Sequence, residues 1–153
     1  MGVDDFRRLL AGFHLVALDT MVFVYHLANH PRYAALTTAV LEAVETGQLA
    51  GMTTTITLAE ILTAPAKAGD RQAAQDYELY LTRFPNLQIA PLDIALARET
   101  ALVRGATGLR TPDAIQVAAA RLVNADAIIT NDRRWGGRVD RPAVIVLDEF
   151  VAP

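Results

Sequence analysis

Three carboxylates in this chain stand in stretches that carry no other charge. Asp19, Glu60 and Asp113 are each the only charged residue within ten or more consecutive positions. A lone charge near a protein core costs several kcal/mol unless it is paired, and no basic residue in the same stretch can pair with it. Grouped carboxylates are a ligand set for Mg²⁺ or Mn²⁺. Such a cation can polarise a phosphoryl oxygen and lower the pKa of an attacking water.

A fourth carboxylate, Asp132, lies in the turn-like "TND" sequence of residues 130–132. Each acid also has an ordinary explanation when it is taken singly. Asn-Asp is common turn chemistry, and in "TPD" Thr111 can cap a helix that Pro112 begins and whose dipole favours Asp113. Whether these acids are caps or ligands therefore depends on where the secondary structure places them.

The acids fall at one predicted edge of a sheet. Asp19 ends the first predicted strand, Glu60 begins the helix after the second, Asp113 begins a later helix, and Asp132 follows another strand. In parallel α/β sheets the carboxyl ends of strands and the amino ends of helices share the edge that binds ligands. Four acids on that edge would repel one another strongly unless a divalent cation is bound, so we interpret them as a metal site.

The elements that must position these acids alternate between strands and helices. Short apolar or β-branched runs predict five strands, and amphipathic segments predict helices between them. This alternation indicates a three-layer α/β/α sandwich around a mostly parallel central sheet. The predicted strands are "HLVALD" (14–19), "LAGMTTTI" (49–56), "LQIAPL" (87–92), "ADAIIT" (125–130) and "AVIVLD" (143–148).

Composition narrows the class of protein. The 153 residues suit one domain, and 52% hydrophobic residues exclude a disordered chain. The chain contains no cysteine and no serine, which excludes disulfides, thiolate metal sites and Ser/His/Asp catalysis. We expect no membrane segment, because the most apolar window (15–28) is short and contains Asp19, and no secretory signal, so the expected location is the cytoplasm.

Charge is distributed unevenly along the chain. The formal net charge is -3, yet residues 98–141 hold 8 arginines against 5 acids. Lysine occurs only once, so nearly every cation is a guanidinium, which binds phosphate in a bidentate manner. The arginines of 98–141 are therefore candidates for binding phosphate groups, although arginine-rich faces are often simply solvated.

The order of these motifs resembles the PIN-domain family, and most closely its VapC-type toxins from bacterial toxin–antitoxin pairs. The resemblance covers nearly the whole chain and rests on "ALDTMVFVYHL", "TTTITLAEIL", "TPDAIQVAAARLVNADAIITND" and the closing strand. It implies a single PIN domain over residues 1–153, with residues 1–13 as an extension before the first strand. Met21 departs from the family pattern, because many relatives carry a small polar residue there.

The same resemblance implies a function and a set of site residues. The protein is expected to be a Mg²⁺- or Mn²⁺-dependent endoribonuclease that uses a metal-activated water. RNA is the expected substrate, and a cognate antitoxin and a second copy of the chain, forming a homodimer, are the expected partners. The implied catalytic and metal-binding residues are Asp19, Glu60, Asp113 and Asp132, with Thr20, Thr130 and Asn131 in support.

Two other classes of function remain open on the sequence. One is a catalytically silent PIN-like module that only binds RNA or protein. The other is an aspartyl-phosphate phosphatase or receiver-like domain. The phosphatase would need a second Asp at the position of Met21, and the receiver would need an active-site lysine, whereas Lys67 lies far along a helix.

Several further residues are given structural interpretations. His26 and His30 have helical spacing but lack a third ligand, so we do not predict zinc. Trp135 is expected to pack on the core rather than stack on a base, and Asp126 to lie at the edge opposite the acids. Tyr77 and Tyr80, on a predicted helix, are expected to serve packing or partner contact.

Overall fold

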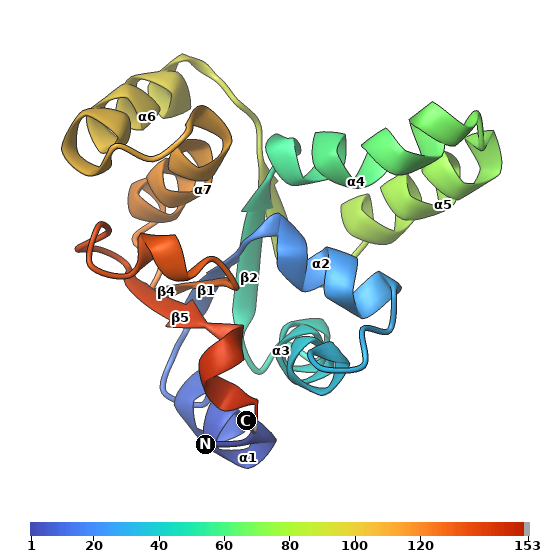
Figure 1. Ribbon diagram of the computed structural model, residues 1–153, viewed down its shortest axis with the longest axis horizontal. Coiled ribbons are helices and arrows are strands. Elements are labelled where there is room, and N and C mark those ends of the chain that lie inside the picture. Colours follow the sequence, from blue (N-terminus) through green and yellow to red (C-terminus); the bar gives the residue numbers. More distant parts are fainter. Residues whose placement is uncertain (152–153) are drawn as a thin grey trace.

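A computed structural model describes residues 1–151 and places a five-stranded sheet at the centre of the molecule (Figure 1). All four strand pairings are parallel, and the strand order is β3-β2-β1-β4-β5. The strands are β1 (Leu15–Leu18), β2 (Ala50–Thr54), β3 (Leu87–Ala90), β4 (Ala127–Thr130) and β5 (Ala143–Val146).

Helices cover both faces of this sheet, which confirms the predicted three-layer sandwich. One hydrophobic core lies between the sheet and a layer that includes α1, α2 and α3, and the other lies between the sheet and α6 and α7. The helices are α1 (Val3–Leu10), α2 (Thr20–Leu27), α3 (Ala34–Glu45), α4 (Thr55–Ala68), α5 (Arg71–Thr82), α6 (Ile94–Thr107) and α7 (Thr111–Leu122), with 3₁₀ turns η1 (Arg133–Trp135) and η2 (Leu147–Phe150).

Alternation along the central strands divides the two cores. Val16 and Leu18 of β1 point to one core, whereas Ala17 between them points to the other. In β4 the neighbours Ile128 and Ile129 are divided in the same way, and both are fully buried. Burial on both faces explains why these strands read as continuous apolar runs.

The second predicted strand is longer than the observed one. The run of residues 49–56 was predicted to be extended, but β2 ends at Thr54, whose hydroxyl accepts a hydrogen bond from the Ile56 amide at 3.2 Å. Thr54 therefore caps α4, and this local cap overrides the β-branched run. As a consequence Glu60, predicted at the start of the helix, lies in its second turn.

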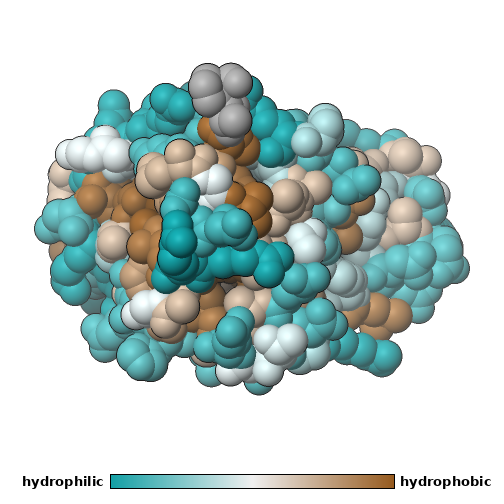
Figure 2. All heavy atoms as spheres, turned by 90° about the horizontal axis from the view of Figure 1, so that it is seen from below, coloured by the Kyte–Doolittle hydropathy of each residue, from teal (hydrophilic) through white to brown (hydrophobic). Residues whose placement is uncertain are grey.

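Residues 3–10 of the predicted extension form a helix that closes one end of the molecule. Phe6 and Leu10 of α1 are buried, and the Phe6 ring lies 5.1 Å from that of Phe150. Seen from this end, hydrophilic side chains break up the remaining hydrophobic surface (Figure 2). The helix is thus packed into the domain rather than appended to it.

No helix within residues 1–151 combines the length and the apolar character that crossing a bilayer requires.

Candidate functional site

The predicted site lies where the three central strands end. Asp19 directly follows β1 and caps α2, and Asp132 lies two residues after β4. Asp113 lies in the first turn of α7, and Glu60 lies on α4, the helix that follows β2. The structure thus brings the four predicted acids to one edge of the sheet.

Asp19 is the most deeply buried of these acids, with 8% of its surface exposed. Its two carboxylate oxygens accept hydrogen bonds from the Thr20 amide at 2.8 Å and the Thr130 hydroxyl at 2.7 Å. Burial raises the pKa of this carboxyl to about 6, against the effect of both hydrogen bonds, and the charges of Asp113 and Glu60 add to the increase. The site therefore holds competing negative charge close to Asp19.

A network of buried hydroxyl groups supports Glu60. The Thr20 hydroxyl donates to Glu60 Oε1 at 2.9 Å and lies 3.1 Å from the hydroxyl of Thr57. Gln116 of α7 is buried, and its amide donates to Thr57 at 2.8 Å and accepts from Thr54 at 2.9 Å. Gln116 was missed from the sequence, although it is a lone polar side chain in the apolar run of α7.

Asp113 has the least supported carboxylate. It accepts no hydrogen bond from any residue in 1–151. Partial burial raises its pKa most, and the charge of Asp132 raises it further. The charge of Arg134 lowers this pKa, but by a smaller amount. Thr111 does not cap this helix: the N-cap is Arg110, whose side chain makes no capping bond, and Thr111 is the first helical residue. Helix capping therefore does not explain Asp113.

Asp132 differs from the other three because a cation already faces it. The Arg134 guanidinium contacts both carboxylate oxygens, with Nε at 2.9 and 3.0 Å and Nη2 at 2.5 Å. This pairing lowers the pKa of Asp132. The carboxylate also caps η1 by accepting from the Arg134 amide at 2.9 Å. Asp132 is thus both a cap and half of an ion pair.

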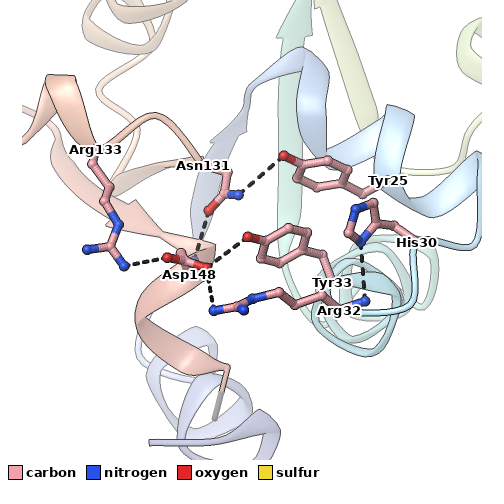
Figure 3. Close-up of polar contacts among 7 residues, drawn as sticks. All are labelled: Tyr25, His30, Arg32, Tyr33, Asn131, Arg133 and Asp148. Atoms are coloured by element: carbon pink, nitrogen blue, oxygen red, sulfur yellow. Dashed lines mark hydrogen bonds and ion pairs between the residues drawn. The ribbon is translucent and has the colours of Figure 1, made fainter. Parts of the chain in front are cut away.

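Asn131 holds the turn that carries Asp132 (Figure 3). Its amide nitrogen donates to the Tyr25 hydroxyl at 3.2 Å, and its amide oxygen accepts from the Asp148 backbone at 2.9 Å. The Asp148 carboxylate accepts from the Tyr33 hydroxyl at 2.8 Å and pairs with two arginines, which lower its pKa together with Tyr33. The two arginines are Arg32 and Arg133. Together these contacts join α2 and the α2–α3 loop to the chain after β4 and β5.

The four acids share an edge but do not form a closed cage. Within residues 1–151 no three Asp, Glu or His side chains are grouped closely enough to hold one metal ion. Thr130 holds Asp19, Thr20 holds Glu60 and Arg134 holds Asp132, so three of the four carboxylates already have side-chain partners. The donors are nevertheless all oxygen, and the raised pKa values of Asp19 and Asp113 reflect burial first and the charges of neighbouring carboxylates second. This donor set fits Mg²⁺ or Mn²⁺.

The pKa of Asp19 predicts how stability depends on pH. Between pH 4 and 6 the unfolded chain releases the Asp19 proton and the folded chain keeps it, so stability falls as pH rises. The loss through Asp19 is about 3 kcal/mol, since the pKa rises from 3.8 to about 6 and one pKa unit is about 1.4 kcal/mol. Urea unfolding of wild type and Asp19→Asn in EDTA, from pH 4 to 7, should show this difference. Parallel curves would contradict it.

The remaining predicted residues have structural surroundings. Trp135 is fully buried, which confirms its packing on the core. Asp126 Oδ2 accepts from the His14 and Leu15 amides at 2.7 and 3.0 Å before β4, which confirms its place at the opposite edge. His30 packs between aromatic rings and His26 lies 3.4 Å from a threonine hydroxyl, while Tyr77 and Tyr80 pack against the core.

A family model described as PIN domain matches residues 16–141, which include the four acids, strands β2, β3 and β4, and β1 except Leu15. Strand β5 lies beyond the matched residues. The chain belongs to the PIN-domain family. This membership confirms the resemblance in the sequence and removes the phosphatase and receiver alternatives. It leaves the roles of the individual acids in this PIN domain as predictions.

Solved structures share the fold of this PIN domain at low sequence identity. A toxin–antitoxin complex from Klebsiella pneumoniae is 20% identical with a TM-score of 0.66, covering 86% of this chain and 97% of that one. VapBC2 from Rickettsia felis, bound to a promoter DNA fragment, is 18% identical with a TM-score of 0.68, covering 86% and 98%. FitAcB from Neisseria gonorrhoeae is 20% identical with a TM-score of 0.65, covering 88% and 99%. No curated protein sequence matches this chain.

Proposed function

We propose that this PIN domain is a Mg²⁺- or Mn²⁺-dependent endoribonuclease and the toxin of a VapBC-type toxin–antitoxin pair, acting in the cytoplasm. The observation that carries the proposal is the Asp19 carboxyl, which is buried at the end of the central strand and raised in pKa by its surroundings. Solved structures with the same fold as this PIN domain include toxin–antitoxin complexes, which supports the same class of function.

The side chains of the edge have separable roles in this proposal. Asp19 and Asp113 would bind the cation most directly, since neither carboxylate has a cationic partner within residues 1–151. Glu60 would bind it directly or through water, and Asp132 would complete the site once Arg134 turns away. Thr20 and Thr130 hold Glu60 and Asp19 in orientation by their hydroxyl groups. When bound, the cation would polarise a phosphoryl oxygen and activate water for in-line attack on phosphorus.

Metal binding is the direct test of this proposal. Replacing EDTA with millimolar Mg²⁺ or Mn²⁺ should raise the melting temperature, because the acids bind the cation only in the folded protein. At ten times the dissociation constant the shift is roughly 3–6 °C for a chain of this size. The Asp19→Asn/Asp113→Asn double variant should lose it, and Asp126→Asn, which changes an acid at the opposite edge, should keep it. KCl at matched ionic strength controls for screening. The same shift in the double variant would place the cation elsewhere.

A silent RNA- or protein-binding module is the second candidate. The observation that favours it is the pairing of Asp132 with Arg134, together with the absence of a closed cage among residues 1–151. In such a module the Arg134 guanidinium takes the place of the metal ion that a nuclease needs. Absence of a metal-dependent melting shift at every Mn²⁺ concentration would favour this module over the nuclease.

The partners form part of the same proposal. We propose a homodimer through the helices of residues 33–83, where α5 exposes Leu79 and where α4 and α5 project from the body (Figure 1). We also propose that a segment of the antitoxin lies near Asp19, Glu60, Asp113 and Asp132 and supplies an arginine to this site. Light scattering at tens of micromolar should give the mass of a dimer, whereas a monomer would contradict the homodimer.

A further inference from the structure

A pocket of about 160 Å³ opens beside the acids and is lined by three arginines. It lies between the α6–α7 connection, the first turn of α7 and the chain from Asp132 onward. Its volume is roughly five times the share of one water in the liquid, which gives room for a phosphate group. The lining residues are Gly108, Leu109, Arg110, Asp113, Asp132, Arg134 and Arg138.

The charges of this pocket are not balanced among themselves. Arg134 is paired with Asp132. Arg110 and Arg138 form no ion pair within residues 1–151, and their charges lower the pKa of Asp113 and Asp132 respectively. Two guanidiniums therefore line a space beside Asp113, a carboxylate that accepts no hydrogen bond from residues 1–151. An anion entering the pocket meets guanidinium donors that no side chain of residues 1–151 uses.

The chemistry of the lining selects phosphate over a nucleobase. Among the described residues that line the pocket, Leu109 is the only large apolar side chain and none is aromatic, so a base has no surface for stacking. Guanidinium groups instead offer a planar fork of donors that matches two phosphate oxygens. The neighbouring Arg133 turns the other way, toward Asp148 (Figure 3).

We propose that Arg110 and Arg138 bind the RNA phosphate next to the scissile bond, in the pocket bounded by Asp113 and Asp132. This rests on the proposed ribonuclease function, because the pocket shares these two acids with the candidate catalytic site. A phosphate held there fixes the register of the strand, so that the adjacent phosphodiester meets Asp19 and Asp113. The contact reads the backbone and carries no base specificity.

The salt dependence of RNA binding tests the pocket. Anisotropy of a fluorescein-labelled single-stranded RNA, in EDTA to prevent cleavage, gives the slope of log Kd against log salt concentration. Losing one phosphate contact lowers that slope by about 0.7. The Arg110→Ala/Arg138→Ala double variant should show this loss, and Arg83→Ala, which removes an exposed arginine outside the pocket, should keep the wild-type slope.

The outcomes separate this proposal from the function on which it rests. If wild type binds and, with Mg²⁺, cleaves the RNA while the double variant keeps the wild-type slope, the pocket proposal is wrong and the ribonuclease stands. If wild type neither binds nor cleaves RNA, the proposed function fails and the pocket proposal fails with it. A slope lowered equally by Arg83→Ala would show general charge loss and would also overturn the pocket.

Discussion

Asp113→Asn and Asp132→Asn are each expected to lower RNA cleavage by about 100-fold or more while the protein stays folded. A rate loss of this size is typical when a group that stabilises charge at the reacting centre is removed. Asn keeps the size of the side chain but removes the charge that a divalent cation needs. Asp113 accepts no hydrogen bond within residues 1–151, so its replacement removes no contact that supports the fold. In metal-free buffer the Asp113→Asn variant should be at least as stable as wild type, because it lacks the Asp113 charge that Asp132 repels.

Asp132→Asn removes the ion pair with Arg134 but retains a cap for η1, since an amide oxygen can still accept from the Arg134 backbone. The expected cost in stability is at most about 1 kcal/mol, because the Arg134 side chain is 65% exposed. Loss of cleavage with a preserved melting temperature would therefore identify a functional role for Asp132.

Asp126→Asn is the matched control for both variants. The two amides that bind Asp126 share the single oxygen Oδ2, and an Asn side chain can offer its own oxygen to both. Its cleavage rate on one RNA in Mg²⁺ should equal that of wild type. Equal activity in all three variants would show that Asp113 and Asp132 serve only as helix and turn residues.

Phe6→Ala is expected to destabilise the protein by about 3–5 kcal/mol, the usual cost of removing a buried phenylalanine ring. Phe6 is 0% exposed and packs against Phe150, so its loss opens a cavity between α1 and the C-terminal turn. Urea unfolding followed by circular dichroism measures the change.

Arg8→Ala, on the exposed side of the same helix, controls for helix propensity and for the loss of a long side chain. Its side chain is 76% exposed, so the expected cost is below about 1 kcal/mol. If Phe6→Ala were equally mild, α1 would be an appendage that the domain does not need.

The fold was predictable because its central strands, β1, β2 and β4, are buried on both faces. Runs such as residues 127–130 leave few alternatives to a central parallel strand, and Asp19 and Asp132 follow directly from where such runs stop. The amphipathic helix around Phe6 was less evident, since its apolar positions gain meaning only from their contact with Phe150.

The site was predictable to the level of its acids but not of their partners. Periodicity could not show that the Thr54 hydroxyl starts α4 early and so moves Glu60 into the second turn. Gln116 and Arg134 act through contacts with Thr57 and Asp132, respectively, and spacing in the sequence does not reveal on which face such side chains meet their partners.

The order of strands has a consequence for how the molecule opens. The three strands that lead to Asp19, Glu60 and Asp132 are the central ones, whereas β3 and β5 are edges bonded on one side only. Local opening of a sheet begins at such edges and reaches the middle last. The amides of β1, β2 and β4 should therefore be among the last in the chain to exchange their hydrogens with solvent, even when the edge strands are loosened.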